Sequence, residues 1–225
     1  MSANPSQELP LFPLGTVLFP AAPLPLHIFE ERYKRMMADH IDHDPIFGVV
    51  LTRTGSEVGD EPSTYSVGTS ASLLNLNPRS NGCFDLAVVG RRRFKILSGD
   101  WSRGYLTASV EWLSEAPSSD SREQLYDLRR ETIAAFGSFV RTVALQIDAN
   151  VPEELFPDDP TETSFAIAAR LPINTWERQA LLEISTTSER LRSLTETLIR
   201  ERALLTKTGA TGSVIEQPTR RFSAN

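Results

Sequence analysis

The sequence has a single cysteine, Cys83, so no disulfide can form within the chain. This scarcity is typical of proteins from reducing compartments. The sequence also lacks any apolar run close to the roughly 18 residues of a membrane helix. Its N-terminal residues, MSANPSQE, are polar, unlike a signal peptide. Together these absences predict a cytoplasmic protein that does not act in a membrane.

Motifs for nucleotide hydrolysis and nucleophilic catalysis are missing as well. No G-x-x-x-x-G-K-[ST] phosphate loop occurs, and no serine lies in a G-x-S-x-G context. The lysines available to a Ser–Lys pair are few: Lys34, Lys95 and Lys207. Cys83 has no histidine near it in sequence, so we interpret it as a small buried hydrophobe. We therefore predict no catalytic residues, no cofactor and no enzymatic activity; a hydrolase or peptidase with an unrecognised site is the alternative.

Neither half of the chain is basic. Residues 1–116 contain 10 Lys and Arg against 13 Asp and Glu, and residues 117–225 contain 13 against 16, so each half carries −3 of the total −6. General nucleic-acid binders are more often basic. The charge balance therefore disfavours nucleic acid as a partner.

A proline-rich ribbon, Leu9–Tyr33, is the most distinctive stretch present: LPLFPLGTVLFPAAPLPLHIFEERY. Five prolines lie between Pro10 and Pro25, which excludes a helix interior. The apolar residues among them exclude a disordered linker. We predict an extended segment that forms an edge or crossing strand of a β-domain. Apolar residues then recur at helical spacing from Phe29 to Ile41, which predicts a helix there.

The period of the pattern changes in the middle of the chain. Short strand patterns continue to about residue 113, and Asn81-Gly82 is a strong hairpin signal between two of them. After a linker-like stretch, SEAPSSDS, helical periodicity takes over, and cap-x-x-Glu starts occur at Asp159, Asn174 and Thr186. The pattern predicts an α+β protein with a β-domain over 8–116, a helical bundle over 119–205 and a disordered tail over 206–225.

Several motifs occur together in one order: LPLFPLGTVLFP, LPLHIFEERY, FGVVL with EVG nearby, VGTSA, GRRRFKIL and YLTASVEWL. This set resembles the N-terminal, substrate-recognising domain of Lon-type ATP-dependent proteases. The later run FAIAARLPINTWERQALLEISTTSERLRSLTETLIR resembles the helical half of that region, so the resemblance extends from about Glu8 to Leu205. It implies a PUA-like β-pseudobarrel followed by an α-helical bundle.

The chain departs from a full Lon protease in its length, because an ATPase and a peptidase domain do not fit in 225 residues. The resemblance therefore implies a stand-alone substrate-binding or adaptor module in protein quality control. Its expected partners are unfolded or extended protein segments. Since PUA-like barrels sometimes bind RNA, an RNA-binding module is a further alternative, and fold alone does not decide between them.

Two stretches contain histidines that are candidates for a site, one around His40 and the other at His27. His40, His43 and Asp44 have a spacing that one metal ion could bridge. A solvated helix end explains the same residues, because histidine suits the negative C-terminal dipole, and we predict no metal site. His27 precedes the expected helix and is interpreted as a hydrogen-bonded structural histidine.

The predicted peptide-binding groove combines Phe29, Arg32 and Tyr33 with Arg91 and Arg93. The first three leave the ribbon beside methionines, which adapt to varied partners. The arginines belong to the basic run RRRFK and would attract acidic residues or a peptide carboxylate. Strand alternation places Arg92 with Phe94, which predicts a half-buried Arg92. We expect micromolar affinity for extended segments, about −8 kcal/mol.

Overall fold

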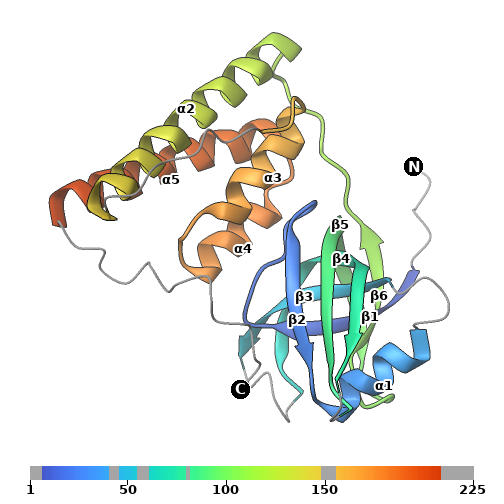
Figure 1. The fold of residues 1–225 in the computed structure, drawn as a ribbon. Coiled ribbons are helices and arrows are strands. Elements are labelled where there is room, and N and C mark those ends of the chain that lie inside the picture. The colour runs from blue at the N-terminus through green and yellow to red at the C-terminus, as the bar shows by residue number, and fades with distance from the viewer. Residues whose placement is uncertain (1–6, 41–45, 55–60, 80–81, 148–155, 209–225) are drawn as a thin grey trace. The chain divides into compact units, whose positions relative to one another are not determined.

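The computed structural model describes residues 7–40, 46–54, 61–79, 82–147 and 156–208. The chain divides into two compact units between Ser114 and Glu115. The first contains the strands and one helix, and the second contains the other described helices (Figure 1). The predicted mixed α+β fold is thus confirmed. No described helix is long and apolar enough to cross a membrane.

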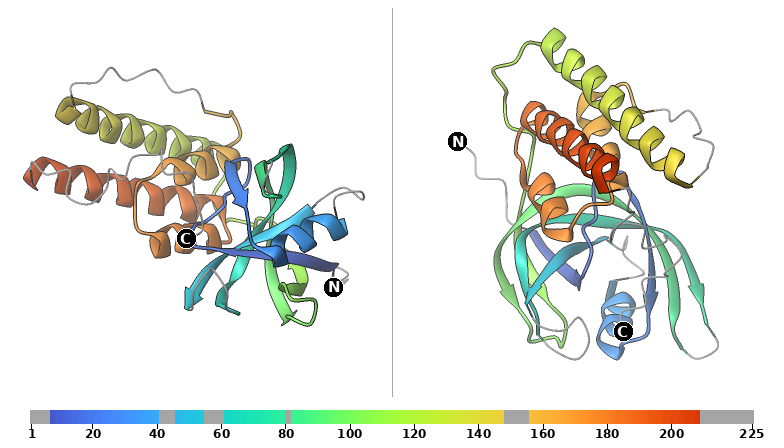
Figure 2. Two further views of the ribbon diagram at one scale, coloured as in Figure 1. Left: turned by 60° about the horizontal axis from the view of Figure 1, so that its bottom comes forward. Right: turned by 90° about the vertical axis from the view of Figure 1, so that its left-hand side faces the viewer.

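The β-unit contains a six-stranded sheet in the order β2-β5-β4-β3-β1-β6. Its elements are β1 (Gln7–Leu14), β2 (Pro23–Ile28), α1 (Glu31–His40), β3 (Ile46–Thr54), β4 (Ser63–Pro78), β5 (Phe84–Asp100) and β6 (Thr107–Trp112). Paired strands are antiparallel except β1 and β3, which are parallel. Because β5 also pairs with β6, the pairing runs full circle through β5, β4, β3, β1 and β6 (Figure 2). Among the described strands, β2 alone lies outside this circle.

The prolines of β1 lie where the strand changes partner. Gln7–Pro10 pairs with β6, whereas Leu11–Leu14 pairs with β3. The N–H of Leu11 donates to the Leu106 carbonyl over 2.8 Å, on the side of β6. The backbone N–H and C=O groups of successive residues in a strand point to opposite sides. The nitrogen of Pro13 therefore faces the β6 side after that pairing has ended. The nitrogen of Pro10 faces the β3 side before that pairing begins. No ladder bond is lost, so the ribbon can cross between two partners, as the sequence predicted.

The edge strand β2 directs its own prolines outward. Gly90 of β5 exchanges two hydrogen bonds of 2.9 Å with Ala21 and Ala22, which fixes the side of β5 that faces β2. By alternation, Leu24, Leu26 and Ile28 bond to β5, and Pro23 and Pro25 face away. Prolines at an exposed edge offer no donors to an incoming strand. The sheet is thereby protected from strand addition at this edge.

The two faces of the sheet carry separate apolar clusters. Val49 and Val50 are neighbours in β3 but belong to different clusters, as alternating side chains require. The larger cluster includes Tyr33, Met36 and Met37 of α1, which are 2%, 1% and 3% exposed. The predicted helical stripe is confirmed for Tyr33, Met36 and Met37, which pack in this cluster; Phe29 precedes the helix, and Ile41 lies outside the described residues.

Phe94 fills the smaller cluster because two glycines leave room for its ring. A Cβ atom on Gly48 would lie 2.6 Å from Phe94 Cζ, and one on Gly68 would lie 2.7 Å from the same atom. Gly90 meets a similar constraint, since a Cβ there would lie 2.1 Å from the carbonyl oxygen of Phe19. The glycine that interrupts the strand pattern at position 90 is therefore required by a close backbone approach.

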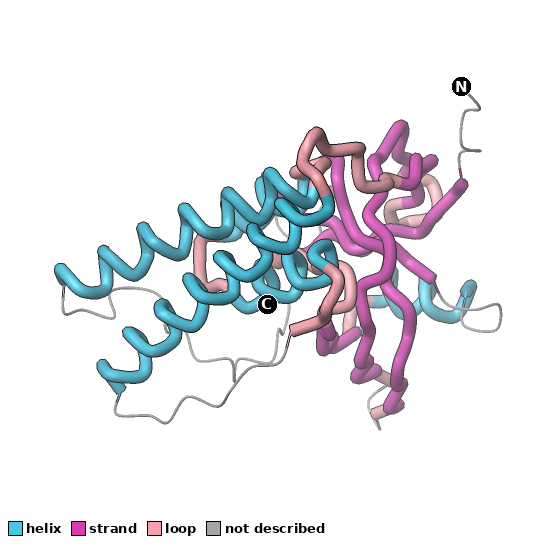
Figure 3. Tube along the Cα trace, turned by 90° about the horizontal axis from the view of Figure 1, so that it is seen from above, coloured by secondary structure: helices cyan, strands magenta, loops and turns pink. Residues whose placement is uncertain are grey.

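The helical unit consists of four described helices: α2 (Arg122–Ile147), α3 (Pro160–Arg170), α4 (Thr175–Glu183) and α5 (Thr187–Thr208). The long helices α2 and α5 run alongside each other (Figure 3). The Thr132 hydroxyl of α2 donates to the Leu191 carbonyl of α5 over 3.2 Å. α5 extends three residues beyond Leu205, where the predicted tail begins; residues 209–225 lie outside the described residues.

The predicted helix starts are largely confirmed by their hydrogen bonds. Asp159 accepts from the Glu162 N–H at 2.9 Å, and Thr186 accepts from the Glu189 N–H at 3.3 Å. Asn174 is the N-cap residue of α4, as predicted, but its side chain accepts no N–H of the first turn; its Nδ2 donates to Glu177 Oε2 at 3.4 Å instead. A reciprocal capping box at α2, which the sequence reading missed, links Ser121 and Gln124 through bonds of 2.7 and 3.2 Å.

Candidate peptide-binding site

The five predicted groove residues lie in two separate parts of the β-unit. Phe29, Arg32 and Tyr33 follow the end of β2, where Ile28 pairs with Phe84. Arg91 lies seven residues further along β5, a span of about 23 Å in an extended strand. The residues therefore do not line one groove, because the strand that carries the arginines runs away from α1.

Two of the five side chains are also inaccessible. Tyr33 is 2% exposed and packs against Phe12, with ring centroids 4.1 Å apart. Arg93 is 4% exposed, and its carbonyl accepts the Leu113 N–H at 3.0 Å. Arg32 is half-buried, bonds Glu30 at 3.0 Å and stacks over Tyr33. Peptide contact thus stays a prediction only for the more exposed members, above all Arg91.

Arg91 and Arg92 form a β-bulge directly before the buried Arg93. Gly90 pairs with Ala71 and Arg93 pairs with Thr69, so both intervening arginines oppose the single residue Ser70. The Ser70 hydroxyl accepts from the Arg92 N–H at 3.1 Å and donates to the Arg92 carbonyl at 3.2 Å. Both arginines are exposed, so the predicted half-burial of Arg92 is wrong. The bulge interrupts the strict alternation on which that prediction relied.

Arg92 adjoins an aromatic side chain from β6, whereas Arg91 contacts β4. The Arg92 guanidinium lies 4.8 Å from the centroid of the Trp112 ring, and Arg91 Nε donates to Ser72 Oγ over 3.1 Å. Trp112 meets Phe94 edge-on, at 6.3 Å between centroids. We call Arg91, Arg92 and Trp112 the arginine–tryptophan surface. Sequence analysis missed Trp112 and Arg92, because their contact depends on the pairing of β5 with β6.

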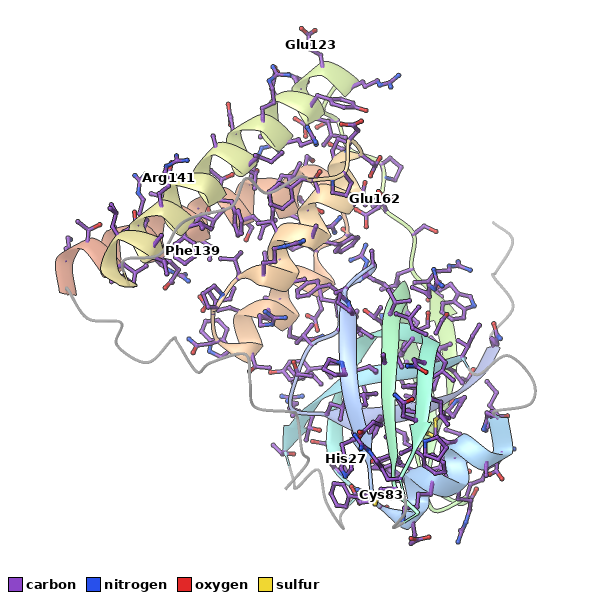
Figure 4. All side chains as sticks on the ribbon, in the orientation of Figure 1. His27, Cys83, Glu123, Phe139, Arg141 and Glu162 are labelled. Carbon is purple, nitrogen blue, oxygen red and sulfur yellow. The ribbon has the colours of Figure 1, made fainter. Side chains whose placement is uncertain are left out.

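The clearest polar cluster elsewhere in the unit involves His27. Its Nδ1 lies 2.6 Å from Asp85 Oδ1, and Arg79 Nε donates to the other oxygen of Asp85 at 2.6 Å. These bonds from His27 and Arg79 hold the pKa of the Asp85 carboxyl below its ordinary value. The prediction that His27 is hydrogen-bonded is confirmed by this contact, and its structural role stays a prediction. Cys83 lies at the same end of the unit and is buried, at 8% exposure (Figure 4).

The histidine stretch after α1 is only partly within the described residues. His40 Nδ1 lies 2.9 Å from the Met36 carbonyl, one helical turn earlier. His43 and Asp44 lie outside the described residues, and the described part of the chain holds no cluster of three or more His, Cys, Asp or Glu suited to a metal.

Comparison with known proteins identifies the family. Residues 8–200 match the model of the ATP-dependent protease La (LON) substrate-binding domain. The chain belongs to the LON substrate-binding domain family. Lon protease of Escherichia coli K12 is 30% identical over 196 residues, covering 83% of this chain and 24% of that protein. Lon protease 2 of Myxococcus xanthus is 28% identical over 211 residues, covering 88% and 24%.

Solved structures agree with this assignment. The Lon N-terminal domain protein from Xanthomonas campestris superposes with a TM-score of 0.62 at 25% identity, covering 84% of this chain and 98% of that one. The N-terminal domain of Mycobacterium avium complex Lon protease gives 0.61 at 18% identity, which shows the fold alone. This LON substrate-binding domain thus spans about a quarter of its curated relatives, 24% for the two described above.

Proposed function

We propose that this LON substrate-binding domain recognises unfolded or extended segments of other proteins without modifying them. The observation that carries the proposal is the family match, which covers residues 8–200 and names a substrate-binding domain. Support for binding over hydrolysis comes from the sequence, which has no phosphate loop. Such a module would act in the cytoplasm as a substrate receptor or adaptor.

The fold details fit that role. The circle of pairing from β5 to β6 supports a PUA-like pseudobarrel, and the succession of helices after Glu115 supports a bundle like that of the Lon N-terminal region. A rigid sheet positions exposed side chains without a large ordering cost on binding. The prolines on the edge of β2 disfavour recognition by strand addition, so recognition by side chains is the mode we propose.

The test is a titration of the full chain with a fluorescent protein that is kept unfolded by reduction and alkylation of its disulfides, with its native, disulfide-bonded form as the control. We expect micromolar binding of the unfolded form, about −8 kcal/mol, and much weaker binding of the folded form. Incubation with ATP or casein should give no turnover. Equal affinity for both forms, or turnover that survives repurification and is abolished by a point mutation, would contradict the proposal.

A further inference from the structure

We infer that the arginine–tryptophan surface binds acidic stretches of protein chains through their carboxylates. The inference rests on the proposed function, recognition of protein segments, and specifies the chemistry of the segment. It starts from three side chains on neighbouring strands, Arg91 and Arg92 of β5 and Trp112 of β6.

The two arginines are neighbours within one β-bulge. Both oppose Ser70 across the bulge, and the Ser70 hydroxyl bonds the N–H and the carbonyl of Arg92. The bulge is therefore stabilised by hydrogen bonds to a residue of β4. Bulges commonly redirect side chains beside binding sites.

Each guanidinium is held by one contact that leaves donors for a ligand. Arg91 uses Nε to bond Ser72, which leaves both terminal nitrogens outside that bond. The Arg92 guanidinium lies over the Trp112 ring, a contact that uses none of its N–H donors in a bond to a carboxylate. Guanidinium donors match the two oxygens of a carboxylate, and side chains already held in place lose less entropy when they bind one.

The charges around the surface favour an acidic ligand. Two other arginines of this unit form ion pairs: Arg79 pairs with Asp85, and Arg103 pairs with Glu8 at 3.2 Å. Among the described residues, neither Arg91 nor Arg92 forms an ion pair with a carboxylate. The chain as a whole carries −6, so its net charge opposes the approach of an acidic segment, and the two arginines outside ion pairs supply a local attraction. An extended nucleic acid would meet the same repulsion along its whole length, and we therefore argue for protein.

The experiment measures the full chain with two short fluorescent peptides of identical length, one rich in Asp and Glu and the other with the matching Asn and Gln. We expect the acidic peptide to bind more tightly at low salt and to lose this advantage at high salt. The double variant Arg91→Gln/Arg92→Gln should weaken acidic-peptide binding about tenfold. The matched control Arg130→Gln/Arg202→Gln removes the same charge from exposed positions of the helical unit and should bind like wild type.

Circular dichroism confirms folding first; if the double variant is unfolded, the two single variants are measured in its place. Unchanged acidic-peptide affinity in folded variants overturns this inference, and the proposed function stands if the unfolded protein still binds. Equal affinity for the two peptides likewise overturns this inference and leaves the proposed function standing. If neither the peptides nor the unfolded protein bind, the proposed function fails as well. If single-stranded RNA binds more tightly than the acidic peptide and depends on the same arginines, the surface serves nucleic acid and the inference is wrong.

Discussion

Nη2 of Arg190 donates to Oε2 of Glu115 over 2.8 Å, which joins the first residue of the helical unit to its last helix. The Arg190 side chain is fully buried. It also donates to Ser164 at 2.8 Å and to the Ile184 carbonyl at 2.9 Å, and its guanidinium lies 3.8 Å from the Phe165 ring centroid. One cation thus connects α3, α5 and the chain segments that precede α2 and α5.

Replacing this cation should destabilise the helical unit. Arg190→Leu keeps an apolar stem but leaves Ser164, the Ile184 carbonyl and Glu115 without their shared donor, which predicts a loss of about 2–4 kcal/mol in the free energy of unfolding. Urea unfolding followed by the helical circular dichroism signal measures it. Arg130→Gln, which removes an exposed arginine of α2, should change the same quantity by less than about 0.5 kcal/mol. Equal effects of the two variants would contradict the role given to Arg190.

Replacement by alanine should change stability in opposite directions at Gly68 of the β-unit and Gly137 of the helical unit. In Gly68→Ala the new Cβ would lie 2.5 Å from the Val49 carbonyl oxygen, a backbone atom that cannot move aside cheaply. We expect destabilisation of about 1–3 kcal/mol. In Gly137→Ala the nearest atom is 3.3 Å away at the flexible end of Arg141, and α2 gains a better helix former. That variant should gain about 0.5–1 kcal/mol. Thermal unfolding of both proteins under one condition tests the contrast.

The turn before β2 should tolerate glycine and reject branched residues. Ala21 has φ of 60°, and the Ala22 N–H donates to the Phe19 carbonyl at 3.1 Å, as in a type II turn. Ala21→Val should cost about 1 kcal/mol or more, because a β-branched residue is strained in this conformation. Ala21→Gly should be neutral or slightly stabilising, since relief of strain offsets the greater freedom of the unfolded chain. Equal midpoints of unfolding for the two variants would show that the turn is not strained.

Features that depend on neighbouring residues could be predicted from the sequence. The cap at Asp159 and the crossing ribbon with Pro10 and Pro13 follow from local chemistry. Of the arginine–tryptophan surface only Arg91 was predicted, because Arg92 and Trp112 depend on a bulge opposite Ser70 and on the pairing of β5 with β6, and neither leaves a local pattern. Alternation therefore misassigned Arg92, whose backbone departs from the regular ladder.

The junction between the strand and helix patterns is a second feature that could not be predicted from the sequence. Its composition predicted a linker from Ser114 to Ser121, yet much of it is bonded to the helical unit. The Ala116 N–H donates to the Ser185 carbonyl at 2.8 Å, and the Ser118 hydroxyl lies 2.9 Å from that of Ser188. Small polar residues suit a flexible linker and a hydrogen-bonded segment equally, so composition could not distinguish them.

Asp120, near the end of this junction, should give the protein a measurable dependence on acid pH. Arg192 Nη2 donates to Oδ1 of Asp120 over 2.6 Å, and the Ser118 hydroxyl donates to Oδ2 over 2.8 Å. The bond from Arg192, with those from Ser118 and Ser188, lowers the pKa of Asp120 to about 2. An unfolded aspartate has a pKa of about 3.9, so folding favours the charged form.

The sign of the pH effect follows from that difference. The contribution of Asp120 to stability is complete above the unfolded pKa, declines as the pH falls below about 4, and is lost below about 2. The difference in urea midpoint between wild type and Asp120→Asn should therefore be constant near neutral pH and shrink on acidification. In an NMR titration the Asp120 carboxyl should have its midpoint at about 2. Arg192→Gln should raise that midpoint toward about 3.9, whereas Arg202→Gln, the same charge change further along α5, should leave it unchanged. A wild-type midpoint near the ordinary value would show that the bond to Arg192 does not persist in solution.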